Sequence, residues 1–302
     1  MKIFIAGGNG LVGRSLTEEL LQKGHQVTAM GRSIRHEEMP EGTEIIQGDA
    51  ALPGLWQDAV PLHDAVVNLT GVTIFHRWSR SYKEKILKSR LETTGRIVEA
   101  AGEAESRVQV LVNASAVGYY GAAGDQELSE DAPMGDDFLA RVCGDWEKEA
   151  ERAEESGIRV VRARFGIVLS ERGGALVKLQ KVFDRHLGAM LGTGNQWFSW
   201  IHLQDLARIL VRLIEDENIS GAVNCAAPIP VTNRSLTGKL GGVMEKPAIF
   251  PPVPSFVLRG ALGEFSSVLL QGQRVVPSKL LEAGYDFLYP ALTPALQDLL
   301  YK

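Results

Sequence analysis

Cysteine is scarce in this sequence, and the two that occur, Cys143 and Cys225, stand far apart. They belong to no CxxC or Cys/His pattern. A disulfide framework needs several cysteines and a zinc site needs ligands at short spacings, so neither is expected. Histidines such as His25 and His63 show no metal-ligand spacing, and we predict no metal site. This cysteine usage fits the reducing cytoplasm.

The chain also lacks an excess of positive charge and any long apolar segment. Its formal net charge is −5 at pH 7, and no basic cluster lies beside an apolar helix. We therefore expect neither nucleic acid nor an anionic membrane as a partner. The first apolar run stops at Gly7, short of a signal-peptide core, and no later run reaches membrane-spanning length. We expect a soluble protein that is not exported.

Apolar residues are abundant enough for a sizeable core, at 45% of 302 residues. Apolar runs of strand length alternate with segments of helical period, which is typical of a parallel sheet covered by helices. The expected strands are Ile3 to Ala6, Gln26 to Met30, Glu44 to Gln47, Ala65 to Leu69, Val108 to Ala114 and Arg159 to Phe165. The expected helices are Val12 to Lys23, Ser81 to Ala101 and Asp137 to Glu155, with Gly24 and Gly157 as C-terminal caps.

A glycine-rich stretch, GGNGLVG, follows the first strand and opens the first helix. In such a βαβ unit Gly7 makes the turn, Gly10 lets the backbone approach a pyrophosphate, and Gly13 lets helix and strand pack closely. The helix N-terminus adds free N–H groups and the positive end of its dipole. A tight turn without a ligand is the competing interpretation, but this context favours a dinucleotide site. Its expected residues are Gly7, Gly8, Asn9, Gly10, Leu11, Val12 and Gly13.

The end of the second strand indicates which dinucleotide is bound. An NAD site usually carries an acidic residue there, whereas this chain has Gly31, Arg32 and Ser33. A guanidinium binds a 2′-phosphate through charge-assisted hydrogen bonds, so we predict NADP(H), held by Arg32 and Ser33. The alternative is an exposed arginine without a ligand role.

Motifs along the whole chain resemble one family. They are GGNGLVG, IIQGD, NLTG, NASAVGYYG, RFGIVLS, SRLETT, FLARVCGDWEKEA, WIHLQDLA and the tail PVPSFVLRGALGE with GQRVVPSKLLEAGYDF. Together they resemble an atypical extended short-chain dehydrogenase/reductase, an NAD(P)-dependent epimerase/dehydratase-like "epimerase family" protein. The resemblance implies an α/β fold: a Rossmann-type, doubly wound parallel sheet with a smaller C-terminal domain that forms a lid on the substrate side.

The domain boundaries are predicted from the alternation of strands and helices and from the distribution of proline. The regular alternation weakens beyond Gly166, and residues 227–254 carry much of the proline. We predict an NADP(H)-binding domain over 1–168, to which 200–226 return, and a smaller domain over 169–199 and 227–302.

The resemblance also implies further cofactor contacts. Asp49 would lie beside the adenine, and the other implied residues are Asn68, Leu69, Thr70, Gly71, Arg90, Ser115, Phe165, Gly166 and Ile167. Three of these regions have alternatives: Asp49 as the cap of a turn, Asn68 as a partner for backbone groups at a strand end, and Arg164, next to Phe165, as a buried ion-pair partner.

The expected proton relay is absent. Reductases of the wider superfamily use a Ser or Thr with a Tyr-x-x-x-Lys pair, in which the lysine lowers the pKa of the tyrosine. Ser115 matches the first role, but Leu139 and Cys143 stand where Tyr and Lys belong. We name Ser115, Tyr119 and Tyr120 as catalytic candidates, with one tyrosine packing in its loop as the alternative.

Two other residues are less persuasive candidates. Arg141 can polarise an oxygen but cannot act as a base, and a solvated helix residue is its alternative. His202, with Asp205 close behind, is predicted to be a helix cap or structural contact.

Two functional hypotheses follow. One is an NADP(H)-dependent oxidoreductase or epimerase acting on an unknown small carbonyl or hydroxyl compound, with Trp78, Trp197 and Trp200 as possible cleft walls. The other is a catalytically weak NADP(H)-sensing regulatory protein, which the missing relay favours. Either would be cytoplasmic, as a monomer or a homodimer.

Overall fold

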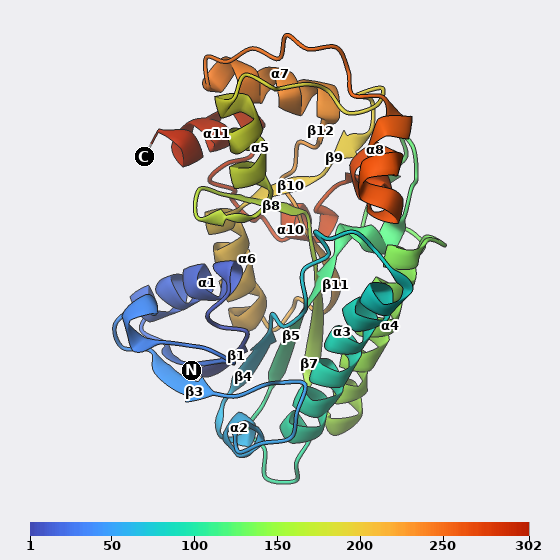
Figure 1. The fold of residues 1–302 in the computed structure, drawn as a ribbon. Coiled ribbons are helices and arrows are strands. Elements are labelled where there is room, and N and C mark those ends of the chain that lie inside the picture. Colours follow the sequence, from blue (N-terminus) through green and yellow to red (C-terminus); the bar gives the residue numbers. More distant parts are fainter. Residues whose placement is uncertain (302) are drawn as a thin grey trace.

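The protein is described by a computed structural model covering residues 1–301. Its centre is a seven-stranded parallel sheet in the order β11-β7-β5-β4-β1-β2-β3 (Figure 1). The strands are β1 (Lys2–Ala6), β2 (Gln26–Gly31), β3 (Glu44–Gln47), β4 (Ala65–Asn68), β5 (Val110–Ala116), β7 (Arg159–Phe165) and β11 (Gly221–Cys225). The six strands expected from the sequence all form, each within two residues of its expected ends. The seventh, β11, had no strand prediction.

Side chains of the central strands alternate between two helical layers, as the period of a strand requires. Ile3 and Ile5 face one core that includes Leu16, whereas Phe4 faces a second core that includes Ile97. In Figure 1, α1 and α6 cover one side of the sheet, and α3 and α4 cover the other. These layers comprise α1 (Leu11–Gln22), α2 (Trp56–Ala59), α3 (Arg80–Ala101), α4 (Phe138–Glu151) and α6 (Leu203–Glu215).

Local signals explain where the long helices begin and end. The Ser79 hydroxyl accepts a hydrogen bond from the Tyr82 N–H at the start of α3, and Asp137 caps α4 through the Ala140 N–H. Gly24 and Gly157 have φ values of 79° and 76°, the left-handed conformation expected of C-terminal caps. The helix expected over Asp137 to Glu155 is α4 followed by a 3₁₀ segment, Arg152–Ser156.

A smaller unit lies above the carboxyl ends of the strands in Figure 1. Its own core includes Leu176, Leu240 and Leu296. Its helices are α5 (Gly174–Asp184), α7 (Asn233–Val243), α8 (Ser255–Leu262), α9 (Ser266–Leu270) and α11 (Leu292–Leu300). The helix α10 (Ser278–Glu282) instead packs against β11, with Leu280 in the core that includes Leu16. The short strands are β6 (Glu127–Leu128), β8 (Ile167–Ser170), β9 (Trp197–Phe198), β10 (Trp200–His202), β12 (Val231–Thr232) and β13 (Arg274–Val275).

Two residues singled out in the sequence belong to the framework. Trp200 is completely buried in the core of the smaller unit, so it walls no cleft and the expectation for it is corrected. His202 caps α6 by accepting a hydrogen bond from the Gln204 N–H, as predicted. Within residues 1–301, none of the helices combines the length and apolar character that a membrane crossing requires.

Candidate functional site

The glycine-rich loop is built from close backbone approaches. Gly7 has φ of 79°, and a Cβ there would lie 3.1 Å from the Leu69 backbone. A Cβ at Gly13 would lie 2.5 Å from the Gly8 carbonyl oxygen, so α1 packs directly on the turn. The N-cap of α1 is Gly10, which supplies no side-chain cap, and a Cβ there would fill space next to the Gly7 carbonyl oxygen, 3.2 Å away. The loop therefore leaves the helix N-terminus open to an anion.

Asn9 joins this loop to the end of β2. Its Nδ2 donates to the Ser33 carbonyl oxygen at 3.3 Å, and its side chain fits over Gly31, where a Cβ would lie 2.5 Å from Oδ1. The Arg32 side chain is exposed, and no carboxylate of residues 1–301 forms an ion pair with it. A free guanidinium thus stands beside the loop. Asp49 Oδ1 accepts a hydrogen bond from the Ala51 N–H at 3.0 Å, which gives this carboxylate the turn-capping role.

The end of β4 is fixed by Asn68, which is fully buried. Its Oδ1 accepts hydrogen bonds from the N–H and hydroxyl of Thr70, at 3.1 and 2.6 Å, and its Nδ2 donates to Thr94 and Asn113. The Asn68 side chain therefore turns toward the protein, as in the strand-end alternative. A ligand here would meet the backbone of Leu69, Thr70 and Gly71 instead.

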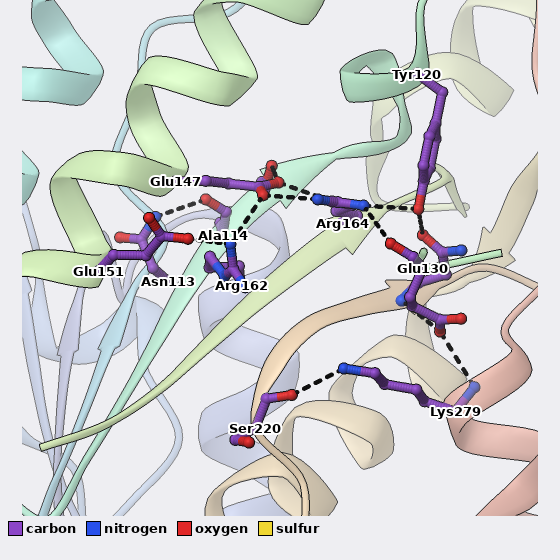
Figure 2. Close-up of polar contacts among 12 residues, drawn as sticks. Asn113, Ala114, Tyr120, Glu130, Glu147, Glu151, Arg162, Arg164, Ser220 and Lys279 are labelled. Atoms are coloured by element: carbon purple, nitrogen blue, oxygen red, sulfur yellow. Dashed lines mark hydrogen bonds and ion pairs between the residues drawn. The ribbon is translucent and has the colours of Figure 1, made fainter. Parts of the chain in front are cut away.

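Ser115 lies at the end of β5 and is connected to a buried ion pair. Its hydroxyl donates to Glu147 Oε1 of α4 at 2.6 Å. Glu147 accepts from Arg164 Nε at 2.9 Å and Nη2 at 2.8 Å, and all three side chains are buried. Figure 2 shows Arg164 between Glu147 and the Tyr120 hydroxyl. Arg164 is therefore an ion-pair partner, one of the two roles left open by the sequence.

The neighbouring tyrosines differ in what their hydroxyls do. Tyr120 is buried, donates to Asn224 Oδ1 at 2.7 Å and accepts from Arg164 Nη1 at 2.9 Å. Burial raises the pKa of Tyr120 to about 12. Tyr119 is only partly buried and packs its ring 3.5 Å from the Arg164 guanidinium carbon. No hydrogen bond within residues 1–301 engages the Tyr119 hydroxyl. Tyr120 is thus the tyrosine that packs in the loop, and Tyr119 keeps a hydroxyl free for a substrate.

The α4 face beside Ser115 is apolar. A Cβ at Gly118 would lie 3.5 Å from Leu139 Cβ and 3.9 Å from Cys143 Sγ, so both residues face the end of β5. Cys143 is buried, and burial raises the pKa of its thiol to about 12. Neither side chain can move a proton at neutral pH. Arg141 of the same helix is exposed and donates to the Asp136 carbonyl oxygen at 2.5 Å.

The end of β7 approaches the smaller unit closely. The Ile167 N–H donates to the Ser199 carbonyl oxygen at 2.8 Å, and a Cβ at Gly166 would lie 3.1 Å from that oxygen. The Phe165, Gly166 and Ile167 backbone is therefore fixed at the edge where ligands of parallel sheets bind.

A cavity of about 730 Å³ opens between the smaller unit and the start of α4. Trp78 and Phe138 line one side of it, with their rings 5.3 Å apart in an edge-to-face arrangement. Ser255, Arg259 and Ser267 are among the polar residues of the other side. Trp78 thus lines a cavity as expected. Trp197 is not among the residues that line this cavity, and its indole N–H donates to Asp125 at 2.8 Å.

Comparison with known proteins gives the family. The profile of the NAD dependent epimerase/dehydratase family matches residues 3–226, and that of a domain of unknown function (DUF1731) matches 253–299. The chain belongs to the NAD-dependent epimerase/dehydratase family. This confirms the resemblance seen in the motifs. It also agrees with the Rossmann-type sheet that the resemblance implied.

Several relatives match over almost the full length. The epimerase family protein SDR39U1 homolog, chloroplastic, of Arabidopsis thaliana is 36% identical, with 99% of this chain and 87% of the relative covered. The epimerase family protein YfhF of Bacillus subtilis is also 36% identical, with coverage of 99% and 98%.

Among solved structures, human epimerase family protein SDR39U1 (isoform 2) with NADPH is 33% identical, with a TM-score of 0.87 and full coverage of both chains. UDP-glucuronic acid 4-epimerase from Bacillus cereus, in complex with UDP-glucuronic acid and NAD, has a TM-score of 0.81 at 17% identity, covering 99% of this chain and 98% of that one. The second likeness concerns the fold alone.

Proposed function

We propose that the protein binds NADP(H) and exchanges hydride with a small carbonyl or hydroxyl compound, as an oxidoreductase or an epimerase. The observation that carries this proposal is the free Arg32 guanidinium beside the uncapped N-terminus of α1. Together they offer separate positive sites to a pyrophosphate and to a 2′-phosphate. The human relative crystallised with NADPH supports the same choice of cofactor.

NADPH, when bound, supplies a hydride at its nicotinamide ring. The protein must then hold the substrate oxygen and deliver a proton to it. Tyr119 has the free hydroxyl for that transfer, and Arg164 holds its ring in place through a cation–π contact. Ser115 already donates its proton to Glu147, so toward a substrate hydroxyl its oxygen would act as an acceptor.

A decisive experiment follows deuterium from stereospecifically labelled NADPH into a panel of aldehydes and ketones. Label in the alcohol product supports hydride transfer, and Tyr119→Phe should slow it while Tyr120→Phe mainly lowers stability. Absence of label from every compound contradicts the enzymatic proposal.

The second candidate is a protein that senses NADP(H) without turning over a substrate. Leu139 and Cys143 favour it, because they leave the face opposite Ser115 without a group that titrates near neutral pH. In that case NADPH should protect α8 to α11 from limited proteolysis although no label is transferred. If label is transferred and protease sensitivity is unchanged, the sensing candidate fails.

A further inference from the structure

The cavity of about 730 Å³ has walls from both units of the chain. Trp78 belongs to the segment between β4 and α3, and Phe138 begins α4, whereas Ser255 and Arg259 belong to α8 of the smaller unit. In Figure 1, α8 lies above α3 and α4. A cavity of this size between two units is a common place for a small organic ligand.

This cavity adjoins the residues proposed to handle the substrate oxygen. Phe138 lines it, and the next residue of α4, Leu139, packs against Gly118, where a Cβ would lie 3.5 Å from Leu139 Cβ. Gly118 directly precedes Tyr119. A ligand in the cavity can therefore extend from α8 toward Tyr119.

One wall of the cavity is apolar and rigid. The Trp78 ring lies edge-to-face with the rings of Phe138 and Phe265, at centroid distances of 5.3 and 5.8 Å, and its indole N–H donates to the Ile74 carbonyl oxygen at 3.0 Å. Leu270 also lines the cavity. Since the indole N–H is already bonded, this wall offers a ligand apolar contact, which suits a flat ring.

Positive charge lies at the α8 end of the cavity. Arg259 lines it, and a Cβ at Gly263, another lining residue, would lie 3.4 Å from Arg77 Nε. Neither arginine forms an ion pair with a carboxylate of residues 1–301. Glu264, which also lines the cavity, pairs with Lys83 Nζ at 2.6 Å. Two uncompensated positive charges therefore border the cavity, in a chain whose net charge is −5.

Neutral hydrogen-bond donors accompany the two arginines. The hydroxyls of Ser266 and Ser267 are engaged, because they donate to the carbonyl oxygens of Gly263 and Glu264. By contrast, no hydrogen bond within residues 1–301 engages the Ser255 hydroxyl or the side-chain amide of Gln271, and both residues line the cavity. These two groups can donate to a carboxylate.

We propose that this cavity binds the substrate and that the substrate is a carboxylic acid with a flat, aromatic ring. The carboxylate pairs with Arg77 and Arg259, and the ring packs against Trp78 and Phe138. This inference rests on the proposed function and specifies its substrate class. Because Arg77 belongs to the first domain and Arg259 to the smaller unit, the bound acid also joins the two units.

The test measures binding to the full chain by calorimetry, with naphthoate, its neutral isostere naphthamide, acetate and UDP as probes. We expect naphthoate to bind roughly tenfold more tightly than naphthamide, because hydrogen bonds to a charged group are the strong ones. It should also bind at least about tenfold more tightly than acetate, which buries no ring. If naphthoate binds no better than naphthamide, or no better than acetate, the inference is overturned. Tighter binding of UDP than of naphthoate through the same arginines also overturns it and assigns the cavity to a nucleotide.

Arg77→Gln and Arg259→Gln should each weaken naphthoate binding roughly tenfold and change naphthamide binding by no more than about twofold. Both arginines are exposed, so the melting temperature should change by no more than about 2 °C, which separates lost binding from lost structure. Arg80→Gln is the matched control, since Arg80 is an exposed arginine close to Arg77 in the chain and does not line the cavity.

A structural role for the arginines predicts a different result. Arg259 lies in the last turn of α8, where a cation also interacts favourably with the helix dipole. If naphthoate binding is unchanged in both variants, the arginines serve only the end of the helix and the inference is wrong.

The inference and the proposed function fail in different ways. If labelled NADPH transfers deuterium to neutral ketones as fast as to aromatic keto acids, the proposed function stands and the carboxylic acid class does not. If naphthoate binds through the two arginines but no label leaves NADPH, hydride transfer fails while the binding site stands.

Discussion

Replacing Glu147 by glutamine should destabilise the protein strongly, because it leaves the Arg164 charge buried without a counter-charge. Both side chains of the pair are only 3% exposed, and Glu147 receives two hydrogen bonds from Arg164 and one from Ser115. Removing one partner of such a buried pair costs about 3 to 5 kcal/mol. Applying the rule for domains of 150 to 250 residues, roughly 2 to 4 °C per kcal/mol, lowers the melting temperature by about 6 to 20 °C.

The assay is thermal unfolding followed by circular dichroism, with urea denaturation as a second measure. Glu151→Gln is the matched control, since Glu151 lies one turn further along α4 and is 38% exposed where it pairs with Arg162, which is 21% exposed. Losing that pair should cost about 1 kcal/mol or less. The double variant Glu147→Leu/Arg164→Met should regain much of the lost stability, because it removes both charges together. Equal stability of Glu147→Gln and Glu151→Gln would refute the reasoning.

Four further outcomes are expected. Arg32→Ala should weaken NADPH binding about tenfold to a hundredfold and leave NADH nearly unchanged, which fluorescence titration of both cofactors measures; equal native affinities would remove Arg32 from the argument. Gly10→Val should abolish binding of both cofactors in a folded protein, checked by calorimetry, and retained affinity would make the turn purely structural. Tyr119→Phe should slow label transfer about a hundredfold to ten-thousandfold with unchanged NADPH affinity, and an unchanged rate would exclude Tyr119. Burial raises the pKa of Tyr120 to about 12, so its protonated form contributes stability that is complete below pH 10 and is lost as pH rises toward 12. Urea unfolding across this range should show a smaller decrease of the free energy of unfolding in Tyr120→Phe than in the native protein.

The first domain was predictable because its signals are local. Ile3 and Ile5 alternate with Phe4 in a strand that runs into a glycine loop, and this pattern determines strand, turn and helix without reference to the rest of the chain. The strand β11 was not predicted, since its segment GAVNC is short and differs from a loop only when β7 lies beside it. Trp200 was misplaced for a related reason: a tryptophan lines a cleft or fills a core according to what the smaller unit packs against it.

The candidate site was predictable at the level of residue types but not of roles. The sequence shows that Ser115 and two tyrosines follow the strand expected over Val108 to Ala114 and that Arg164 lies near the end of the strand expected over Arg159 to Phe165, and such strand ends meet at one edge. Which hydroxyl is free depends on partners from distant segments: Asn224 of β11 engages Tyr120, and Glu147 of α4 engages Ser115. Arg90 was named through a family resemblance, whereas its unpaired charge emerges only when every carboxylate around it can be located.

Some arginines near the carboxyl ends of the strands have a carboxylate partner and others do not. This difference connects the fold to a function. Arg164 of β7 and Glu147 of α4 neutralise each other, and Ser115 at the end of β5 donates to the same carboxylate. Arg32 and Arg90 take no part in that ion pair, and no carboxylate within residues 1–301 forms an ion pair with either of them. A guanidinium that is buried without a counter-charge costs stability unless a ligand supplies that charge, whereas an exposed one such as Arg32 carries no such cost. Arg32 follows β2 and Arg90 lies against Gly71 after β4, so the two cations stand on either side of β1, the strand that runs into the glycine-rich loop where the proposed dinucleotide would lie.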